Sequence, residues 1–175
     1  MENNRQNQIR RLTLTAILMA MVILLSTSWA CITVPGGHLY FNDTVIVLAA
    51  IVLDPVAAFA VGGLGTFLGD LILYPVAMFV SLAAHGLQAV AISVISHHTF
   101  KKKPIVASIL GAIVGAVIMV IGYTLGRAFV YSTPEYAIVK LPWEILQAGI
   151  GVVLGPILVW KVGLGKMMKR VLRTK

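Results

Sequence analysis

Residues 101–130, KKKPIVASILGAIVGAVIMVIGYTLGRAFV, decide the fold class of this chain. After three lysines, Arg127 is the only charged side chain up to residue 130. A helix needs about 20 apolar residues to cross the roughly 30 Å of hydrocarbon in a bilayer. Basic residues beside such a helix mark its cytoplasmic end. The stretch therefore predicts a membrane-spanning helix over residues 104–130 that runs from the cytoplasm outward.

The composition of the whole chain agrees with this prediction. Of 175 residues, 59% are hydrophobic and 11% are charged, whereas soluble domains are about 45–50% apolar and about 25% charged. The excess of apolar residues excludes a disordered chain, and the single cysteine excludes a disulfide scaffold. We predict an all-α membrane protein in which residues 1–175 form one compact domain within the lipid bilayer.

The positions of the basic residues predict topology rather than binding. The net charge is +8, and twelve of the 14 basic residues lie near the N-terminus, at residues 101–103, or after residue 160. Clusters that flank apolar runs keep those ends in the cytoplasm, so we predict no nucleic-acid partner. Both termini and the lysine cluster are expected inside.

This placement determines the number of membrane spans. An even number of crossings must separate the N-terminus from residues 101–103. The first helix provides one of these crossings, so residues 42–98 must provide one or three. They are too long for one. The extra break is Asp54-Pro55, because proline lacks an N–H and biases the preceding residue away from helix. We predict six transmembrane helices with cytoplasmic N- and C-termini, over residues 12–32, 42–54, 55–74, 76–98, 104–130 and 142–162.

The predicted second helix is too short to span the membrane. Thirteen residues reach only about 20 Å at 1.5 Å per residue. Residues 33–41 must therefore dip into the outer leaflet, where irregular backbone is tolerated only against protein or a water-filled cavity. We expect this loop to lie over an outward-facing pocket.

Polar side chains gather at the outer ends of the predicted helices, and the inner halves contain no ionisable group. Intramembrane ionisable residues are costly and indicate function, and a polar cluster that does not continue across the membrane predicts a binding site rather than a channel. The candidate substrate-binding residues are His38, Asn42, Asp70, His85, Gln88, Tyr123, Arg127, Trp143, Glu144 and Gln147.

Several of these residues also have structural explanations. Arg127 could extend to the outer interface, and Asp70 could anchor a helix end. Glu144 lies in the first turn of its predicted helix, where the helix dipole favours a carboxylate. Trp143 is typical of the aromatic belt at the membrane surface. His85 and Gln88 lie far from an interface, and a pocket explains them best.

The sequence lacks the common catalytic motifs. It contains no phosphate-binding loop, no His-Glu-x-x-His and no Gly-x-Ser-x-Gly, so ATP hydrolysis by the chain itself is not expected. We predict no metal site and no cofactor. A small integral membrane enzyme or a lipid-interacting structural membrane protein is the alternative to a binding protein.

Three stretches resemble a known family. They are AILMA at 16–20, which matches an Ala-x-x-x-Ala motif, FNDTVIVLAAIVLDP at 41–55, and GGLGTFLGDL at 62–71. Together with six spans and a basic N-terminus, they resemble the substrate-binding S components of energy-coupling factor (ECF) transporters, the vitamin importers of prokaryotic plasma membranes. Asp54 stands where that family usually has glycine.

The resemblance implies a function and partners. An S component binds a vitamin from outside and is reoriented in the membrane by a transmembrane T component that carries two ABC-type ATPases. Ala16 and Ala20 would contact the T component. SLAAHGLQ at 81–88 resembles the family members whose assigned substrate is hydroxymethylpyrimidine or pyridoxine. Pantothenate is the rival, because Arg127 could pair with its carboxylate.

Overall fold

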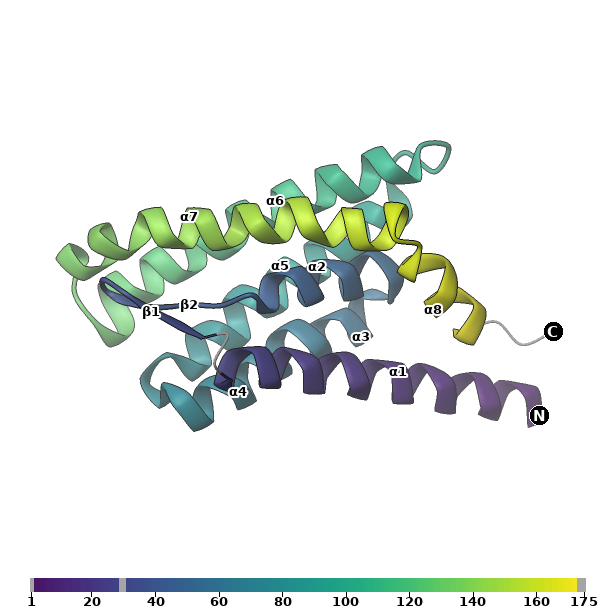
Figure 1. Ribbon diagram of the computed structural model, residues 1–175, viewed down its shortest axis with the longest axis horizontal. Coiled ribbons are helices and arrows are strands. Elements are labelled where there is room, and N and C mark those ends of the chain that lie inside the picture. The colour runs from purple at the N-terminus through teal and green to yellow at the C-terminus, as the bar shows by residue number, and fades with distance from the viewer. Residues whose placement is uncertain (1, 29–30, 173–175) are drawn as a thin grey trace.

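The protein is a bundle of helices with one short hairpin. The computed structural model describes residues 2–28 and 31–172. Figure 1 shows the helices running roughly side by side, with both termini at one end of the bundle and the hairpin towards the other. The elements are α1 (Glu2–Thr27), β1 (Ile32–Val34), β2 (Gly37–Leu39), α2 (Asn42–Val52), α3 (Pro55–Phe59), η1 (Ala60–Leu64), α4 (Gly65–Leu73), η2 (Pro75–Ala77), α5 (Met78–His98), α6 (Pro104–Gly126), η3 (Arg127–Tyr131), α7 (Pro134–Pro156), η4 (Ile157–Lys161) and α8 (Leu164–Leu172).

Within the described residues, five helical segments are long and apolar enough to cross a membrane. Wide π-helical turns (η1, η3 and η4) continue α3, α6 and α7, so that several labelled elements form one span. The five segments are Arg5–Thr27, Pro55–Leu73, Pro75–His98, Pro104–Tyr131 and Pro134–Lys161.

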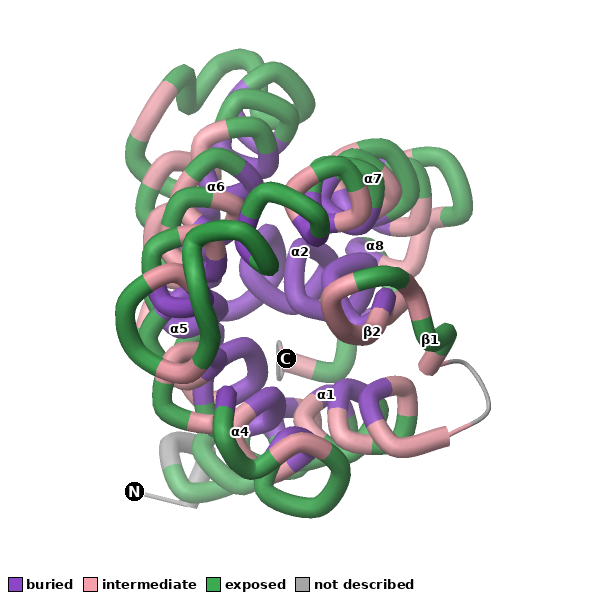
Figure 2. The backbone as a smooth tube through the Cα atoms, turned by 90° about the vertical axis from the view of Figure 1, so that its left-hand side faces the viewer, coloured by how far each residue is buried: buried purple, intermediate pink, exposed green. Residues whose placement is uncertain are grey.

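The short helix α2 lies at the centre of the bundle. All eleven of its residues are buried, and Figure 2 shows it enclosed by the longer helices. It packs mainly against α7, α5 and α1. Because protein surrounds α2 on every side, its length of about 16 Å need not match the thickness of the bilayer.

The break between α2 and α3 has a clear local cause. The carboxylate of Asp54 accepts hydrogen bonds from the backbone N–H of Val56 at 3.2 Å and of Ala57 at 3.3 Å. Pro55 follows at the first helical position, where its missing N–H is no loss. Asp54 also forms an ion pair of 2.5 Å with Arg11 of α1.

Several helix boundaries differ from the prediction, most of all in the first and last spans. The first helix begins at Glu2 instead of residue 12. It ends at Thr27 instead of residue 32, because the chain turns into the hairpin. The last span begins at Pro134 instead of residue 142, and Pro142 lies inside α7. Membrane helices tolerate an internal proline when neighbouring groups compensate for the lost hydrogen bond. The polar residues within 135–140 favour a loop by composition, but Lys140 is buried against protein.

Glycines allow α4 to pack closely on α1. A Cβ atom at Gly69 would lie 2.7 Å from Cβ of Ser26, and one at Gly65 would lie 3.1 Å from Cγ1 of Val22. Small residues at such positions permit the backbone approach that stabilises membrane helices. Ala16 and Ala20 of α1 are exposed instead, so they contribute little to this internal packing.

Candidate functional site

The hairpin formed by β1 and β2 closes one end of the bundle. Its strands pair antiparallel, with Val34 opposite Gly37. Arg127 donates from Nη1 to the carbonyl oxygen of Gly36 at 2.5 Å. The backbone N–H of Tyr40 donates to Oε1 of Gln147 at 3.0 Å. These two bonds, from η3 and α7, hold the hairpin over the space between the helices.

The hairpin turn fits tightly against α7. Gly36 has a φ of +81°, which favours glycine, and a Cβ atom there would lie 3.0 Å from Cβ of Lys140. A Cβ atom at Gly37 would lie 3.3 Å from Nη1 of Arg127. Only glycine therefore allows the turn to lie this close to the two basic side chains.

A small cavity lies beneath the hairpin. The space open to a water-sized sphere is about 20 Å³, which is room for about one water molecule. Pockets for small organic ligands measure about 300–1,000 Å³, so a ligand requires the hairpin or the side chains to move. The lining residues are Gly37, His38, Tyr40, Asp70, Tyr74, Ala77, Met119, Tyr123, Arg127, Tyr131, Lys140, Glu144 and Gln147.

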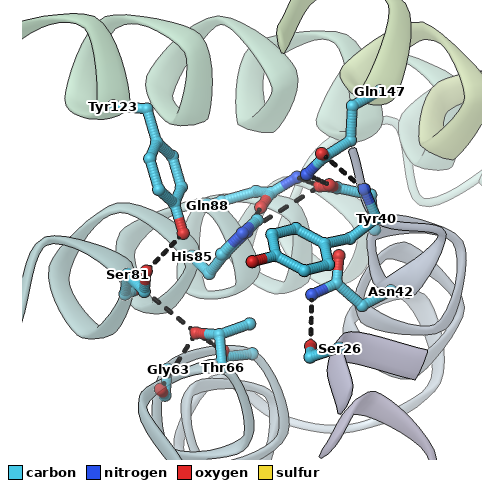
Figure 3. Close-up of polar contacts among 12 residues, drawn as sticks. Ser26, Tyr40, Asn42, Gly63, Thr66, Ser81, His85, Gln88, Tyr123 and Gln147 are labelled. Atoms are coloured by element: carbon cyan, nitrogen blue, oxygen red, sulfur yellow. Dashed lines mark hydrogen bonds and ion pairs between the residues drawn. The ribbon is translucent and has the colours of Figure 1, made fainter. Parts of the chain in front are cut away.

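Asp43 organises the amides at one side of this space. Its Oδ1 accepts from Nε2 of Gln88 at 2.8 Å, and its Oδ2 accepts from Nε2 of Gln147 at 2.6 Å. Gln88 then presents its Oε1 to Nδ1 of His85 at 2.6 Å, so Nδ1 carries the proton. Figure 3 shows this row of contacts leading from His85 to the backbone of Tyr40.

A chain of hydroxyl groups forms a second wall. The hydroxyl of Tyr123 donates to Oγ of Ser81 at 2.5 Å (Figure 3), and Ser81 donates to Oδ2 of Asp70. The hydroxyl of Tyr40 lies 3.5 Å from Oδ1 of Asp70. Side chains of three helices, α4, α5 and α6, thereby meet around one carboxylate next to Tyr40.

The third wall carries the basic residues. Arg127 pairs with Glu144 at 3.2 Å, and its guanidinium lies 5.2 Å from the ring centre of Tyr131. Lys140 lies one helical turn before Glu144 and is also buried. The buried charged side chains of the described residues are three acids and two bases: Asp43, Asp70, Glu144, Arg127 and Lys140.

Four buried polar atoms around the cavity have no hydrogen-bond partner among the described residues. They are Nδ1 of His38, Nε of Arg127, the hydroxyl of Tyr131 and Oε2 of Glu144. Buried polar groups without partners are rare in folded proteins and point to a missing ligand or water. Four of the eight such atoms among the described residues thus belong to residues that line this one cavity, which makes it the candidate binding site.

Burial also sets the protonation of two hairpin side chains. Partial burial lowers the pKa of His38 below its usual range, because desolvation disfavours the charged imidazolium. Burial raises the pKa of Tyr40, and the nearby carboxylate of Asp70 raises it further. At neutral pH, His38 is therefore neutral and Tyr40 keeps its hydroxyl proton.

The structure brings most of the candidate residues together. Six line the cavity: His38, Asp70, Tyr123, Arg127, Glu144 and Gln147. His85 and Gln88 lie behind them in the Asp43 network. Two others lie elsewhere. Asn42 donates to Oγ of Ser26 at 2.9 Å and joins α2 to α1. Trp143 is half-buried and does not line the cavity.

Sequence reasoning missed Lys140 as a site residue. The predicted helix begins at residue 142, which leaves this lysine in a loop. The spacing of Lys140, Glu144 and Gln147 is the signal that could have found it, because residues three and four apart share one helix face.

The fold and the site define a class of protein: a multi-pass membrane protein with a small polar cavity enclosed near one end. Comparison with known proteins identifies the family. The sequence model of the family described as "ECF-type riboflavin transporter, S component" matches residues 6–163, and the chain belongs to this family. It is a substrate-binding transport subunit and not an enzyme.

The chain is also similar to two other proteins. A protein of Pyrococcus woesei, described as an uncharacterized protein in the gap 3' region, is 30% identical over 150 residues, covering 85% of this chain and 95% of its own length. A solved structure of the S component of a bacterial ECF transporter has a TM-score of 0.73 at 20% identity, covering 91% of this chain and 98% of that chain. The latter similarity establishes the fold.

Proposed function

We propose that this chain captures a small, planar heteroaromatic vitamin from outside the cell and delivers it as part of an ECF-type importer. The observation that carries the proposal is the cavity under the hairpin with its four unpartnered polar atoms. A ligand with several hydrogen-bonding groups would satisfy atoms that otherwise remain buried without partners.

Aromatic side chains around the cavity favour a ring-shaped ligand. His38 and Tyr74 meet edge to face with ring centres 5.7 Å apart, and Tyr74 and Tyr131 meet in the same way at 6.2 Å. Tyr40 and Tyr123 lie on the remaining sides. Aromatic rings interact well with one another in stacked or edge-on contacts, so a flat heterocycle suits these walls.

The charges of the site disfavour an anionic ligand. Arg127 is already paired with Glu144, and Lys140 lies one helical turn before the same glutamate in α7. Three buried acids face two buried bases. A carboxylate ligand such as pantothenate would add a further negative charge to a set of buried side chains in which acids already outnumber bases.

Two classes of vitamin are candidates for the ligand of this cavity. Hydroxymethylpyrimidine or pyridoxine is the first candidate, because each is a small neutral heteroaromatic with polar substituents. Riboflavin is the second, because the family description names it. It is the larger molecule, and it requires a greater opening of the cavity.

The binding experiment compares these ligands directly. The protein is purified in detergent, and mass spectrometry identifies any small molecule that it retains. Titration with hydroxymethylpyrimidine, pyridoxine, riboflavin and pantothenate then ranks their affinities. We expect a heteroaromatic to bind most tightly. Tightest binding of pantothenate would contradict the proposal.

Delivery is proposed to require a T component and two ABC-type ATPases. The buried serines nearer the termini bond to backbone carbonyl groups of the bundle itself. Ser93 donates to Leu53 at 2.7 Å, and Ser108 donates to Pro104 at 2.8 Å. They provide no polar route from the cavity to the other side. Reorientation of the whole subunit in the membrane would move the ligand without such a route.

A further inference from the structure

Asp70 is a buried carboxylate without a cationic partner among the described residues. Its side chain is 4% exposed. The ion pairs of the described residues involve Asp43, Asp54 and Glu144 but not Asp70. An isolated buried carboxylate is costly unless a positive charge or strong donors compensate for its lost hydration.

The hydrogen bonds of Asp70 compensate for that loss only in part. Ser81 donates to Oδ2. The contact of Oδ1 with the Tyr40 hydroxyl is 3.5 Å long, beyond the usual range for an O–H···O bond. A carboxylate oxygen has two lone pairs. Oδ1 therefore retains acceptor capacity, and Asp70 lines the cavity.

The surroundings of Asp70 leave its carboxylate without a direct ionic contact among the described residues. It lies in the C-terminal half of α4 (Gly65–Leu73), the end where the helix dipole disfavours an anion. Two imidazoles, those of His85 and His38, interact with it electrostatically, but neither forms an ion pair with it. Nδ1 of His85 faces Oε1 of Gln88 instead, and burial lowers the pKa of His38.

We infer that the ligand supplies the missing compensation: the substrate carries an amino group, or a basic ring nitrogen that is protonated in the site, and this group donates to Oδ1 of Asp70. This inference rests on the proposed function and narrows it to aminated or basic nitrogen heterocycles. Asp70 is then a specificity-determining residue, since a ligand without such a nitrogen would leave the carboxylate uncompensated.

The inference separates the candidate vitamins by their chemistry. An aminopyrimidine offers an amino group next to a basic ring nitrogen, and pyridoxine offers a pyridine nitrogen. Pantothenate has no basic nitrogen, and the ring system of riboflavin offers an imide N–H rather than a base. We therefore expect the aminopyrimidine and pyridoxine to bind more tightly than pantothenate and riboflavin.

The test uses two probes that differ in one substituent. These are 4-amino-5-hydroxymethyl-2-methylpyrimidine and its 4-hydroxy analogue, titrated by calorimetry into the full-length protein in detergent. The wild-type protein should bind the amino probe at least tenfold more tightly. In Asp70→Asn, the amino probe should lose about 10- to 100-fold in affinity, and the hydroxy probe should change by less than about threefold.

Asp54→Asn is the matched control. It makes the same change at a carboxylate that is paired with Arg11 and does not line the cavity, and it should not alter the preference between the two probes. Equal binding of both probes to the wild-type protein, or an unchanged preference in Asp70→Asn, overturns the inference. The wild-type comparison decides the question even if Asp70→Asn fails to fold.

Failure of the proposed function gives a different pattern. If pantothenate binds and neither pyrimidine, pyridoxine nor riboflavin does, the proposed function and the inference both fail. If riboflavin binds tightly and its affinity is unaffected by Asp70→Asn, the proposed function stands and the inference alone is wrong.

Discussion

At the scale of single residues, the site depends on polar side chains that satisfy one another away from water. Asp43 accepts from two amides, Arg127 joins an acid to the hairpin, and Asp70 accepts from the hydroxyl group of Ser81. In such a network, the loss of one member leaves its partner buried and unpaired, which costs more than the hydrogen bond contributes. Paired substitutions can therefore distinguish the role of each member.

The first prediction concerns the acceptor at the centre of the amide network. Asp43→Asn replaces one acceptor oxygen with a donor that faces the N–H of Gln88 or Gln147. One buried donor then lacks an acceptor, at a cost of about 1–3 kcal/mol. We expect a lower melting temperature in detergent and weaker vitamin binding.

The double variant Asp43→Asn with Gln147→Glu provides the control. It exchanges the amide and the carboxylate, so the new carboxylate at position 147 can accept from both the Tyr40 N–H and the amide at position 43. Stability and binding should recover at least in part. A double variant that loses the sum of the two single effects would contradict this account.

The second prediction concerns the buried ion pair. Arg127→Ala leaves Glu144 charged and unpaired and frees the carbonyl of Gly36. Breaking one partner of a buried pair costs about 3–5 kcal/mol, so we expect a large loss of thermal stability. Adding Glu144→Gln removes the stranded charge and should restore part of it. If the single and double variants melt at the same temperature, the pair is not the cause.

At the scale of elements, the hairpin and α1 provide two separate surfaces. The hairpin lies on α7 through Gly36 and Gly37 and closes the cavity. The exposed face of α1 carries Ala16 and Ala20, and no residue of α1 lines the cavity. Changes in one surface should therefore leave the function of the other intact.

The third prediction tests the fit of the hairpin turn. Gly36→Ala adds a Cβ atom 3.0 Å from Lys140 at a positive φ, and it should lift the hairpin and accelerate ligand dissociation. Gly163→Ala is the control, because Gly163 has a φ of +87° with nothing within 4 Å of its added Cβ. It should cost about 1–2 kcal/mol in stability without changing the dissociation rate. Equal dissociation rates in the two variants would argue against the hairpin as the lid.

The fourth prediction tests the exposed face of α1. Ala16→Leu or Ala20→Leu should leave vitamin binding to the isolated subunit unchanged and prevent assembly with the T component, because bulky residues block close helix contact. Co-purification from cells that express all subunits measures assembly. Val117→Leu, at a position 53% exposed on α6, is the control and should assemble normally. Loss of vitamin binding in the α1 variants would place this face inside the bundle.

At the scale of the whole molecule, the hairpin and the chain termini lie at opposite ends of the bundle (Figure 1), and the cavity is lined in part by the hairpin. The basic residues 101–103 connect α5 and α6 at the end with the termini. Ser132 connects the last two long spans at the end with the hairpin. The positive-inside rule then orients the hairpin outward.

The fifth prediction tests this orientation by cysteine labelling. Cys31 is the single cysteine and is first replaced by serine. In that background, Ser132→Cys should react with a membrane-impermeant maleimide in intact cells, and Lys102→Cys should react only after permeabilisation. If Lys102→Cys is labelled from outside, the orientation is the opposite of the one predicted, and the cavity lies at the cytoplasmic face.

Much of this architecture follows from the sequence. The apolar runs predict the membrane helices, and the break at Asp54-Pro55 follows from local hydrogen bonding and the missing N–H of proline. These features are local, because the free energy of transfer into a membrane is set mainly by the side chains of the segment itself. The clustering of ionisable groups at one end follows from the same segment boundaries.

The partners of those polar groups were decided only by the tertiary structure. Asp43 meets Gln88 and Gln147 across sequence separations of 45 and 104 residues, and no local pattern encodes such contacts. The burial of Lys140 depends on a hairpin that begins about a hundred residues earlier in the chain. Asn42 turns to Ser26 instead of the cavity because α2 is surrounded on all sides. Local composition thus determines which segments enter the membrane, and packing around α2 determines which of their polar groups form the site.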